Sequence, residues 1–119
     1  MATTKAKMKQ FQQLQRWKKA ALGKANEVRV GLGYPPVDHI YKGRRSKSWA
    51  CPITNTIYDE DIDRSSLDVD TFDDIDSGIE VRDRNTGEHR RFRHDMQSLA
   101  FVNHFDKGEY PELVEFDDE

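Results

Sequence analysis

Cysteine and histidine are the side chains of this 119-residue chain best suited to nucleophilic catalysis or to zinc binding. The chain holds one cysteine and four histidines, namely Cys51, His39, His89, His94 and His104. No two of them have the short C-x-x-C or H-x-x-x-H spacing of a structural zinc site, and no third group that would orient a Cys–His pair can be identified. A P-loop and a dinucleotide-binding fingerprint are also missing. The sequence therefore predicts a non-enzymatic protein with no catalytic residue, no metal site and no cofactor.

Alternating acids at Asp59, Asp61 and Asp63 resemble the opening of a calcium-binding loop. The rest of that pattern is not present. Arg64 stands where the loop requires glycine for its sharp turn, and Asp70 stands where it requires a bidentate glutamate. We therefore do not expect an EF-hand.

A basic cluster with an aromatic residue lies in residues 43–57, GRRSKSWACPITNTI. Arg44, Arg45 and Lys47 are followed closely by Trp49, a pattern typical of phosphate contact combined with base stacking. Short basic runs are also common on solvated surfaces, which favours an alternative in which the loop is solvated and Trp49 is buried as an anchor of the core. In that alternative, replacement of Trp49 by alanine destabilises the fold.

Two secondary structures compete directly after this cluster. Proline is favoured in the first turn of a helix, so Pro52 predicts a helix with Cys51 at its N-cap, where a thiol can have a lowered pKa. The β-branched residues that follow favour a strand instead; they are Ile53, Thr54, Thr56 and Ile57. In both alternatives we expect Ile53 to anchor this junction in the core.

Residues 43–57 and 105–114 (FDKGEYPELV) resemble segments of small uncharacterised proteins encoded by actinobacteria and their phages. In that family a Gly-Arg-rich segment runs into a Cys-Pro-Ile/Val motif, and a C-terminal helix ends in Phe-Asp-x-Gly-x-Tyr-Pro-Glu-Leu. The matching residues are Gly43, Arg44, Cys51, Pro52, Ile53, Phe105, Asp106, Gly108, Tyr110, Pro111, Glu112 and Leu113. Thr54 and Asn55 depart from the family's Ala-Arg. The resemblance implies a phage or actinobacterial origin and carries no particular activity.

The net charge of −3 conceals a strong segregation of charge along the chain. Residues 1–49 contain twelve Lys/Arg and two acids, whereas residues 50–80 contain one Arg and ten acids. Residues 81–107 are weakly basic, and residues 108–119 contain six acids and no base. Such asymmetry indicates either two partners of opposite charge or neutralisation of one half by the other within the fold.

Periodic apolar residues predict a long amphipathic helix over residues 3–28. Its stripe consists of Met8, Phe11, Leu14, Ala21, Ala25 and Val28. Lysines, among them Lys18 and Lys19, cover the rest of its surface. The stripe predicts packing on the core, and the lysines are either solvated or in contact with nucleic acid or an anionic membrane.

Residues 58–78 are acidic and are expected to form an irregular segment. Their candidate partner-binding residues are Asp59, Asp61, Asp63, Asp70, Asp73 and Asp74. Interspersed apolar residues would pin the segment to the core or form an acidic-hydrophobic recognition segment. A third interpretation is that the carboxylates imitate the phosphates of DNA.

The chain after residue 78 predicts a β-hairpin at residues 79–93 that turns at residues 85–87. It also predicts a helix at residues 95–107, capped by Asp95. We expect the hairpin arginines to be edge-strand charges that the acidic segment neutralises, rather than a DNA-reading ribbon. The apolar face of the helix would be Met96, Leu99, Phe101, Val102 and Phe105. An acidic tail, residues 108–119, would dock through Tyr110, Leu113, Val114 and Phe116, with its last three residues solvated.

These elements predict a single α+β domain in which the two helices pack on a small antiparallel hairpin. Without an apolar run that would span a membrane, or a signal sequence, we expect a cytoplasmic protein that does not contact a membrane. The predicted function is a phage-type accessory or regulatory protein whose basic half binds nucleic acid through Lys18, Lys19, Arg44, Arg45, Lys47 and Trp49. One alternative is a protein-interaction module or inhibitor that engages a host or virion protein through the acidic segment. Another is a structural protein that assembles into homo-oligomers.

Overall fold

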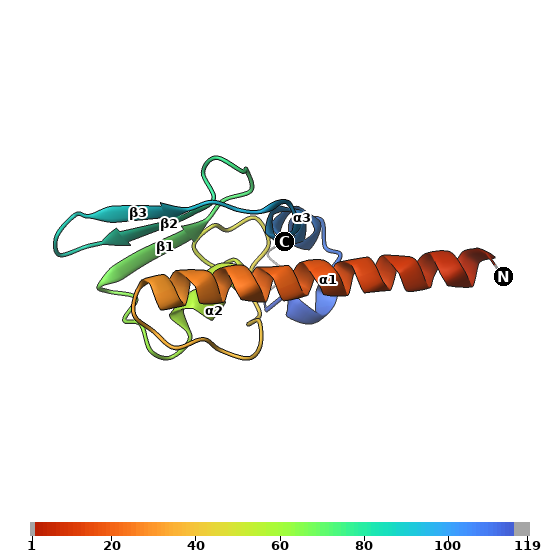
Figure 1. Cartoon of the computed structure of the whole chain (residues 1–119), viewed down its shortest axis with the longest axis horizontal. Coiled ribbons are helices and arrows are strands. Elements are labelled where there is room, and N and C mark those ends of the chain that lie inside the picture. The colour runs from red at the N-terminus through yellow and green to blue at the C-terminus, as the bar shows by residue number, and fades with distance from the viewer. Residues whose placement is uncertain (1, 116–119) are drawn as a thin grey trace.

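The first element of the structure is one unbroken helix, α1 (Ala2–Gly31), of 30 residues and about 45 Å. The computed structural model describes residues 2–115, with side chains from residue 7 onward. Figure 1 shows α1 running along the body of the molecule and extending beyond it at its N-terminal end. The predicted helix over residues 3–28 is therefore confirmed and slightly extended.

Only the C-terminal half of the predicted apolar stripe belongs to the core. Ala21, Ala25 and Val28 are fully buried, whereas Met8 and Phe11 are 58% and 62% exposed. The body ends near Leu14, whose carbonyl accepts a 2.6 Å hydrogen bond from the Tyr110 hydroxyl. Packing of Met8 and Phe11 on the core was therefore a wrong prediction, because the described chain offers them nothing to pack against.

Residues 52–58 form a helix, α2 (Pro52–Tyr58), so the helical alternative was correct there. Proline opens α2 after the extended N-cap Cys51. Ile53 and Ile57, one turn apart, are both fully buried, so tertiary burial outweighs the strand preference of β-branched residues. The Thr56 hydroxyl donates to the Pro52 carbonyl within the helix at 2.7 Å.

Three antiparallel strands form one sheet in the order β1-β2-β3: β1 (Leu67–Thr71), β2 (Ile79–Asp83) and β3 (His89–Phe92). The predicted hairpin is confirmed as β2 and β3, with Gly87 at φ +77° in its turn. The acidic segment was wrongly predicted to be wholly irregular, because its residues 67–71 form β1. In β1, Val69 and Thr71 are buried opposite Val81 and Ile79, while the intervening Asp68 and Asp70 alternate with them.

The C-terminal helix α3 (Met96–Asp106) confirms the prediction for residues 95–107. The Asp95 carboxylate accepts a hydrogen bond from the Ser98 amide at 2.8 Å, as an N-cap does. Phe101, Val102 and Phe105 are buried as predicted. Met96 was wrongly assigned to the apolar face, since it is 71% exposed.

After α3 the chain forms a short 3-10 helix, η1 (Pro111–Leu113). Tyr110, directly before η1, and Leu113, its last residue, are buried, and Val114 packs against the core. The predicted docking of the tail through these three residues is confirmed. The predicted docking of Phe116 and the solvated last three residues lie outside the described part of the chain.

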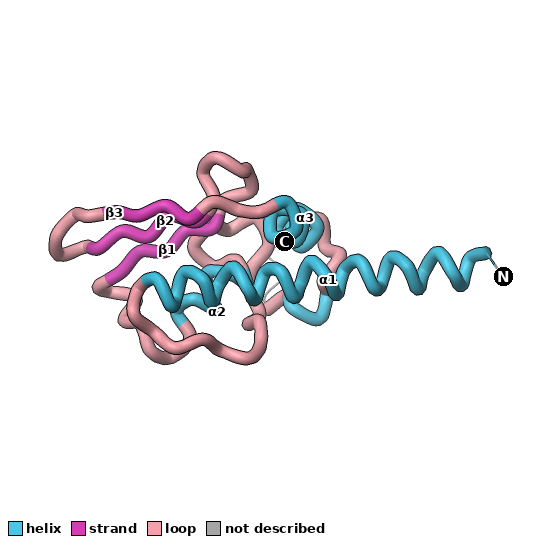
Figure 2. The backbone as a smooth tube through the Cα atoms, viewed as in Figure 1, coloured by secondary structure: helices cyan, strands magenta, loops and turns pink. Residues whose placement is uncertain are grey.

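The architecture is α+β: α1 and α2 lie along one side of a small sheet, and α3 packs on α1 beyond the end of the strands (Figure 2). Trp17 of α1 stacks on His104 of α3, with ring centroids 4.4 Å apart, and His104 is itself in close contact with Glu109. Within residues 2–115 no helix is long and apolar enough to cross a membrane.

Candidate nucleic-acid interface

The loop of residues 43–51, which carries the predicted basic cluster, has a closed and rigid shape. The Arg44 amide donates to the Ala50 carbonyl at 2.7 Å, and the Ala50 amide donates to the Lys47 carbonyl at 3.1 Å. Only glycine fits at residue 43, because a Cβ there would lie 2.5 Å from the Ala50 carbonyl oxygen. Ser46 adopts a positive φ of 58° to complete the turn.

Neighbouring elements hold this loop in place from several sides. Asp106 of α3 accepts a hydrogen bond from the Ser46 amide at 2.8 Å. The Ser48 carbonyl accepts from the Thr71 amide at the end of β1 (2.9 Å) and from the Thr54 hydroxyl of α2 (2.7 Å). Gly43 pairs with the tail in an isolated parallel bridge. The loop is therefore preorganised, so that ordering it on binding would cost little.

Trp49 lies on the outside of this loop and is 54% exposed. The Arg44 guanidinium carbon lies 5.9 Å from the centre of the Trp49 ring, within the range of a cation–π contact. The prediction that Trp49 anchors the core was wrong. Ile53 is the anchor, since the first turn of α2 directs it inward and it is fully buried.

The other two cations of the loop, Arg45 and Lys47, lie next to other segments of the fold. A Cβ at Gly108 would meet the Arg45 guanidinium at 3.0 Å, and Arg45 lines a surface hollow with Pro111 and Val114. Lys47 lines a different hollow, between the loop and α3. Arg45 therefore lies against the C-terminal segment, while Lys47 faces the opposite side of the loop.

Lys18 and Lys19 approach the same region from α1. Lys18 Nζ lies 3.9 Å from a carboxylate oxygen of Glu112, in the segment that Arg45 also contacts. Lys19 is exposed and, with His39, lines a hollow of about 300 Å³. The structure thus brings Lys18 and Arg45, far apart in sequence, against one short segment, residues 108–114.

A further basic surface lies on the projecting segment of α1, which we define as residues 7–13; the sequence predicted its lysines as solvated or in contact with a polyanion, but not the exposure of Met8 and Phe11. All of its side chains are exposed, including Lys7, Lys9 and Phe11. No acid occurs in the chain before Glu27, and seven Lys/Arg precede it. That absence of acids was the available signal, but the apolar stripe favoured burial.

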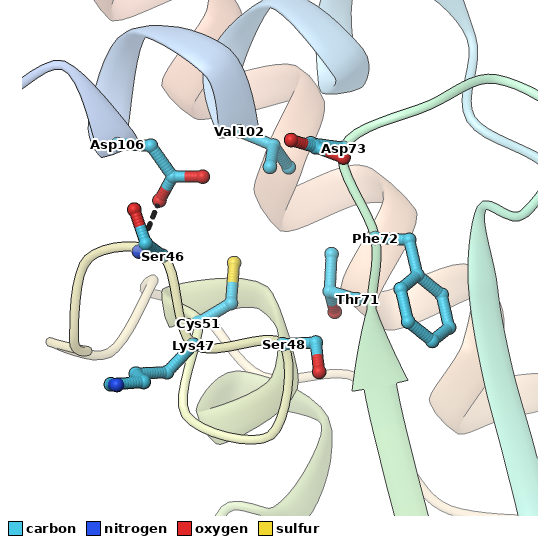
Figure 3. Close-up of a pocket in the computed structure, with 9 residues that line it drawn as sticks. All are labelled: Ser46, Lys47, Ser48, Cys51, Thr71, Phe72, Asp73, Val102 and Asp106. Carbon is cyan, nitrogen blue, oxygen red and sulfur yellow. Dashed lines mark hydrogen bonds between the residues drawn. The ribbon is translucent and has the colours of Figure 1, made fainter.

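A cavity of about 230 Å³ separates the 43–51 loop from α3 (Figure 3). The Cys51 thiol points into it, and Asp106 and Asp73 lie at its rim. Burial raises the pKa of Cys51 to about 12, so the thiol is protonated at neutral pH and is a poor nucleophile. The expectation of a lowered thiol pKa at the N-cap was therefore wrong: burial outweighs the favourable amides of α2.

The carboxyl group of Asp106 shares this cavity. Burial, followed by the charge of Asp73, raises the pKa of Asp106, while the Ser46 amide and Arg45 lower it. No group of three His, Cys, Asp or Glu side chains placed to hold a metal ion occurs among the described residues.

The six predicted partner-binding acids do not form one surface. Most have internal roles: Asp61 pairs with Arg29 (2.6 Å), and Asp63, Asp70 and Asp74 accept hydrogen bonds from Ser65, Ser48 and Ser77. Asp59 ends α2 with a positive φ of 46°. Asp73 is exposed at the cavity rim. This dispersal argues against a rigid ladder of carboxylates that would imitate DNA phosphates.

Acids of residues 68–80 pair with the hairpin arginines, as expected for charges that neutralise one another. Arg84 contacts Asp68 at 2.5 Å, and Arg91 contacts Glu80 at 3.2 Å. Arg90 donates to the Gly31 carbonyl at 2.7 Å. The basic charge of the sheet is thus largely matched within the fold, unlike that of the projecting segment.

Comparison with protein-family models, with curated proteins and with solved structures gives no match for this chain. Its function must therefore be inferred from the charge and geometry of its own residues. Those residues provide two basic surfaces, the exposed projecting segment of α1 and the 43–51 loop with its half-buried cations, and each includes an exposed aromatic side chain.

Proposed function

We propose that this chain is a non-enzymatic protein that binds nucleic acid through the cations of α1 and of the 43–51 loop. The observation that carries the proposal is the acid-free first stretch of α1, with seven Lys/Arg before Glu27. A helix exposed only to water usually mixes acids with its lysines, because i,i+4 ion pairs stabilise it. A surface of one sign instead attracts a partner of the opposite sign over several ångströms.

The position of the cations supports contacts with the phosphate groups of a nucleic acid. Lys7 and Lys9 lie on the projecting segment, which leaves the body, so a polyanion can approach them from most sides (Figure 1). Lys18 and Arg45 both lie against residues 108–114, where Glu112 matches part of the charge of Lys18, so the basic surface without nearby acids is the projecting segment. Phosphate contacts of this kind give affinity without sequence preference.

The proposed biological role is that of a phage-type accessory or regulatory protein acting in the cytoplasm of the host cell. The family resemblance of residues 43–57 and 105–114 supports the phage origin. Preorganised binding surfaces and a cavity without catalytic groups support action by binding.

Fluorescence anisotropy with a labelled 20-nucleotide oligonucleotide, measured over a salt series, tests the proposal. We expect the logarithm of the binding constant to fall linearly with the logarithm of salt concentration, with a slope of about −0.7 to −0.9 per phosphate contacted. The variant Lys7→Gln/Lys9→Gln/Lys18→Gln/Lys19→Gln should bind more weakly and with a shallower slope. The control Arg82→Gln/Arg93→Gln, in β2 and directly after β3, should change neither. Absence of binding by the unaltered chain at the lowest salt would refute the proposal.

A second candidate function is engagement of a basic host or virion protein, or of a second copy of the chain, by the acidic loop of residues 73–76. The observation that favours it is Ile75, which is 42% exposed between exposed aspartates. Affinity capture with the unaltered chain and with Ile75→Ser distinguishes this function, since a specific partner should be lost with the variant. A salt-independent monomer mass in light scattering would exclude self-assembly.

A further inference from the structure

We infer that the nucleic acid bound by this chain is single-stranded, and that its bases stack on Trp49 and Phe11. This inference rests on the proposed function and adds the class of nucleic acid and the residues that recognise it. It is based on the exposed aromatic side chains rather than on the cations.

Aromatic exposure in this protein is confined to its basic segments. Of the Phe, Trp and Tyr side chains in the described part of the chain, Phe11 and Trp49 are the exposed ones. Phe11 lies between lysines in the acid-free part of α1, and Trp49 follows the cations of the 43–51 loop. Aromatic side chains are usually buried, so two exposed ones, both next to cations, indicate a ligand with flat apolar faces and negative charges.

The Trp49 site combines a ring with nearby cations on a loop of fixed shape. Arg44 lies 5.9 Å from the ring centre, and Lys47 is in the same turn. The hydrogen bonds between Arg44, Lys47 and Ala50 hold the indole outward before any ligand arrives. A base that stacks on this indole would place its own phosphates within reach of the loop cations.

The Phe11 site is an apolar surface on a single helix. Phe11 and Met8 line a shallow hollow of about 410 Å³ together with Lys7 and Gln12. The hollow is thus bordered by one cation and one amide, and its floor is apolar. These are the components of a stacking platform with a phosphate contact beside it.

Single strands suit these two sites better than a duplex does. In a duplex each base face is covered by the neighbouring base pair, so a protein ring gains access only by unstacking the bases. In a single strand the faces are accessible, and stacking on an aromatic side chain adds affinity at each base. Phosphate contacts alone would not require exposed Trp49 and Phe11, because lysines suffice for them.

The test uses the full-length chain and four probes: labelled (dT)20, (U)20, a 20-base-pair duplex, and an abasic 20-mer with the same phosphates. We expect (dT)20 or (U)20 to bind at least tenfold more tightly than the duplex and the abasic strand at the same salt concentration. The stronger of the two single strands identifies DNA or RNA as the preferred source. Trp49→Ala and Phe11→Ala should each weaken single-strand binding by about tenfold and leave the salt slope unchanged.

Met96→Ala is the control, because Met96 is a large apolar residue that is also exposed (71%) but lies on α3, outside the basic segments. Its affinities for all four probes should equal those of the unaltered chain. Circular dichroism of each variant verifies the fold, which exposed side chains should not affect.

Two results would overturn the inference in different ways. Equal affinity for the duplex, the abasic strand and the single strands, with no loss in the Trp49 and Phe11 variants, would refute single-strand stacking while the salt-dependent binding of the proposed function stands. Absence of binding to every probe at low salt would refute the inference and the proposed function together.

Discussion

Arg29 is a basic residue that the fold withdraws completely from solvent. Its guanidinium is fully buried and donates to the Pro35 carbonyl (2.8 Å), the Ile57 carbonyl (2.7 Å) and the Asp61 carboxylate (2.6 Å). It thereby joins the end of α1 to the following loop and to the end of α2. The sequence alone gives no signal that Arg29 is buried, because nothing local distinguishes it from its neighbours.

Replacement of Arg29 by alanine should lower the free energy of unfolding by about 3–5 kcal/mol, since it leaves two carbonyls and a carboxylate without their buried partner. Urea denaturation measures the change. Arg16→Ala, at an exposed position of the same helix, should change stability by no more than about 0.5 kcal/mol. Equal effects of the two substitutions would show that the buried network does not stabilise the fold.

The smaller Ile53, and not the larger Trp49, is the side chain that anchors the 43–51 loop and α2 in the core. Because Trp49 is exposed and Ile53 is fully buried, Trp49→Ala should change the free energy of unfolding by about 0.5 kcal/mol or less, whereas Ile53→Ala should cost about 2–5 kcal/mol. Thermal melts of the two variants show which substitution destabilises the fold more. A larger loss with Trp49→Ala would restore it as the core anchor.

His94 makes the stability of the fold depend on pH. It is buried, bonded to the Phe72 carbonyl (2.9 Å) and to Ser98 (3.0 Å). Burial, with a contribution from Lys24, lowers its pKa below the ordinary value of 6.5, against opposing effects of the Phe72 carbonyl and nearby acids. Between the lowered pKa and 6.5 the unfolded chain binds more protons than the folded one. Stability should therefore be fully present above pH 6.5 and fall as the pH decreases below it.

Denaturation midpoints at pH 7.5 and pH 5 test this prediction. His94→Gln should reduce the difference between the two midpoints, whereas His89→Gln, at an exposed position, should keep it. Burial raises the pKa of Asp106, so protonation of Asp106 at more acidic pH stabilises the folded state and opposes the effect of His94. The difference between variants is therefore more informative than the pH dependence of the unaltered chain alone.

At the scale of elements, the sequence predicts α1, the hairpin and α3 well, because each has a local signal. These signals are the helical period of α1, the glycine turn between β2 and β3, and the Asp95 cap of α3. The period-2 alternation of Leu67, Val69 and Thr71 was also present in β1, but its aspartates disfavour strands. Pairing with β2, together with the Tyr58 hydroxyl that contacts Leu67 and Val69, overrides that preference.

α1 consists of a part that folds with the body and a part that does not. Deletion of residues 2–11 should leave the thermal midpoint nearly unchanged, since the described side chains in that range are exposed. The same deletion removes Lys7, Lys9 and Phe11, so we expect weaker nucleic-acid binding with a shallower salt slope. Calorimetry and anisotropy on the shortened chain measure the two effects separately. A large fall in the melting temperature would show that the projecting segment contributes to the fold.

At the scale of the whole molecule, neutralisation within the fold accounts for the charge of the sheet but not for that of the projecting segment. The sheet arginines and the neighbouring acids pair with each other, whereas the first residues of α1 find no acids along their own length. The sequence identifies the cations of the proposed binding surfaces, and their binding to nucleic acid stays a prediction. It could not predict the exposure of Trp49 and Phe11, because exposure depends on where the body ends and on how the 43–51 loop closes.

The hydrogen bond from Tyr110 to the Leu14 carbonyl marks a boundary in the exchange of amide hydrogens along α1. Before Leu14 the helix relies on its own hydrogen bonds, and isolated helices shorter than about 12–15 residues are marginal in water. Hydrogen–deuterium exchange should therefore be fast at residues 7–13, through helix–coil fluctuations, and as slow as global unfolding at residues 21–28. A polyanion that neutralises the lysines should slow exchange at residues 7–13 selectively, and equal protection on both sides of Leu14 in the free protein would contradict this boundary.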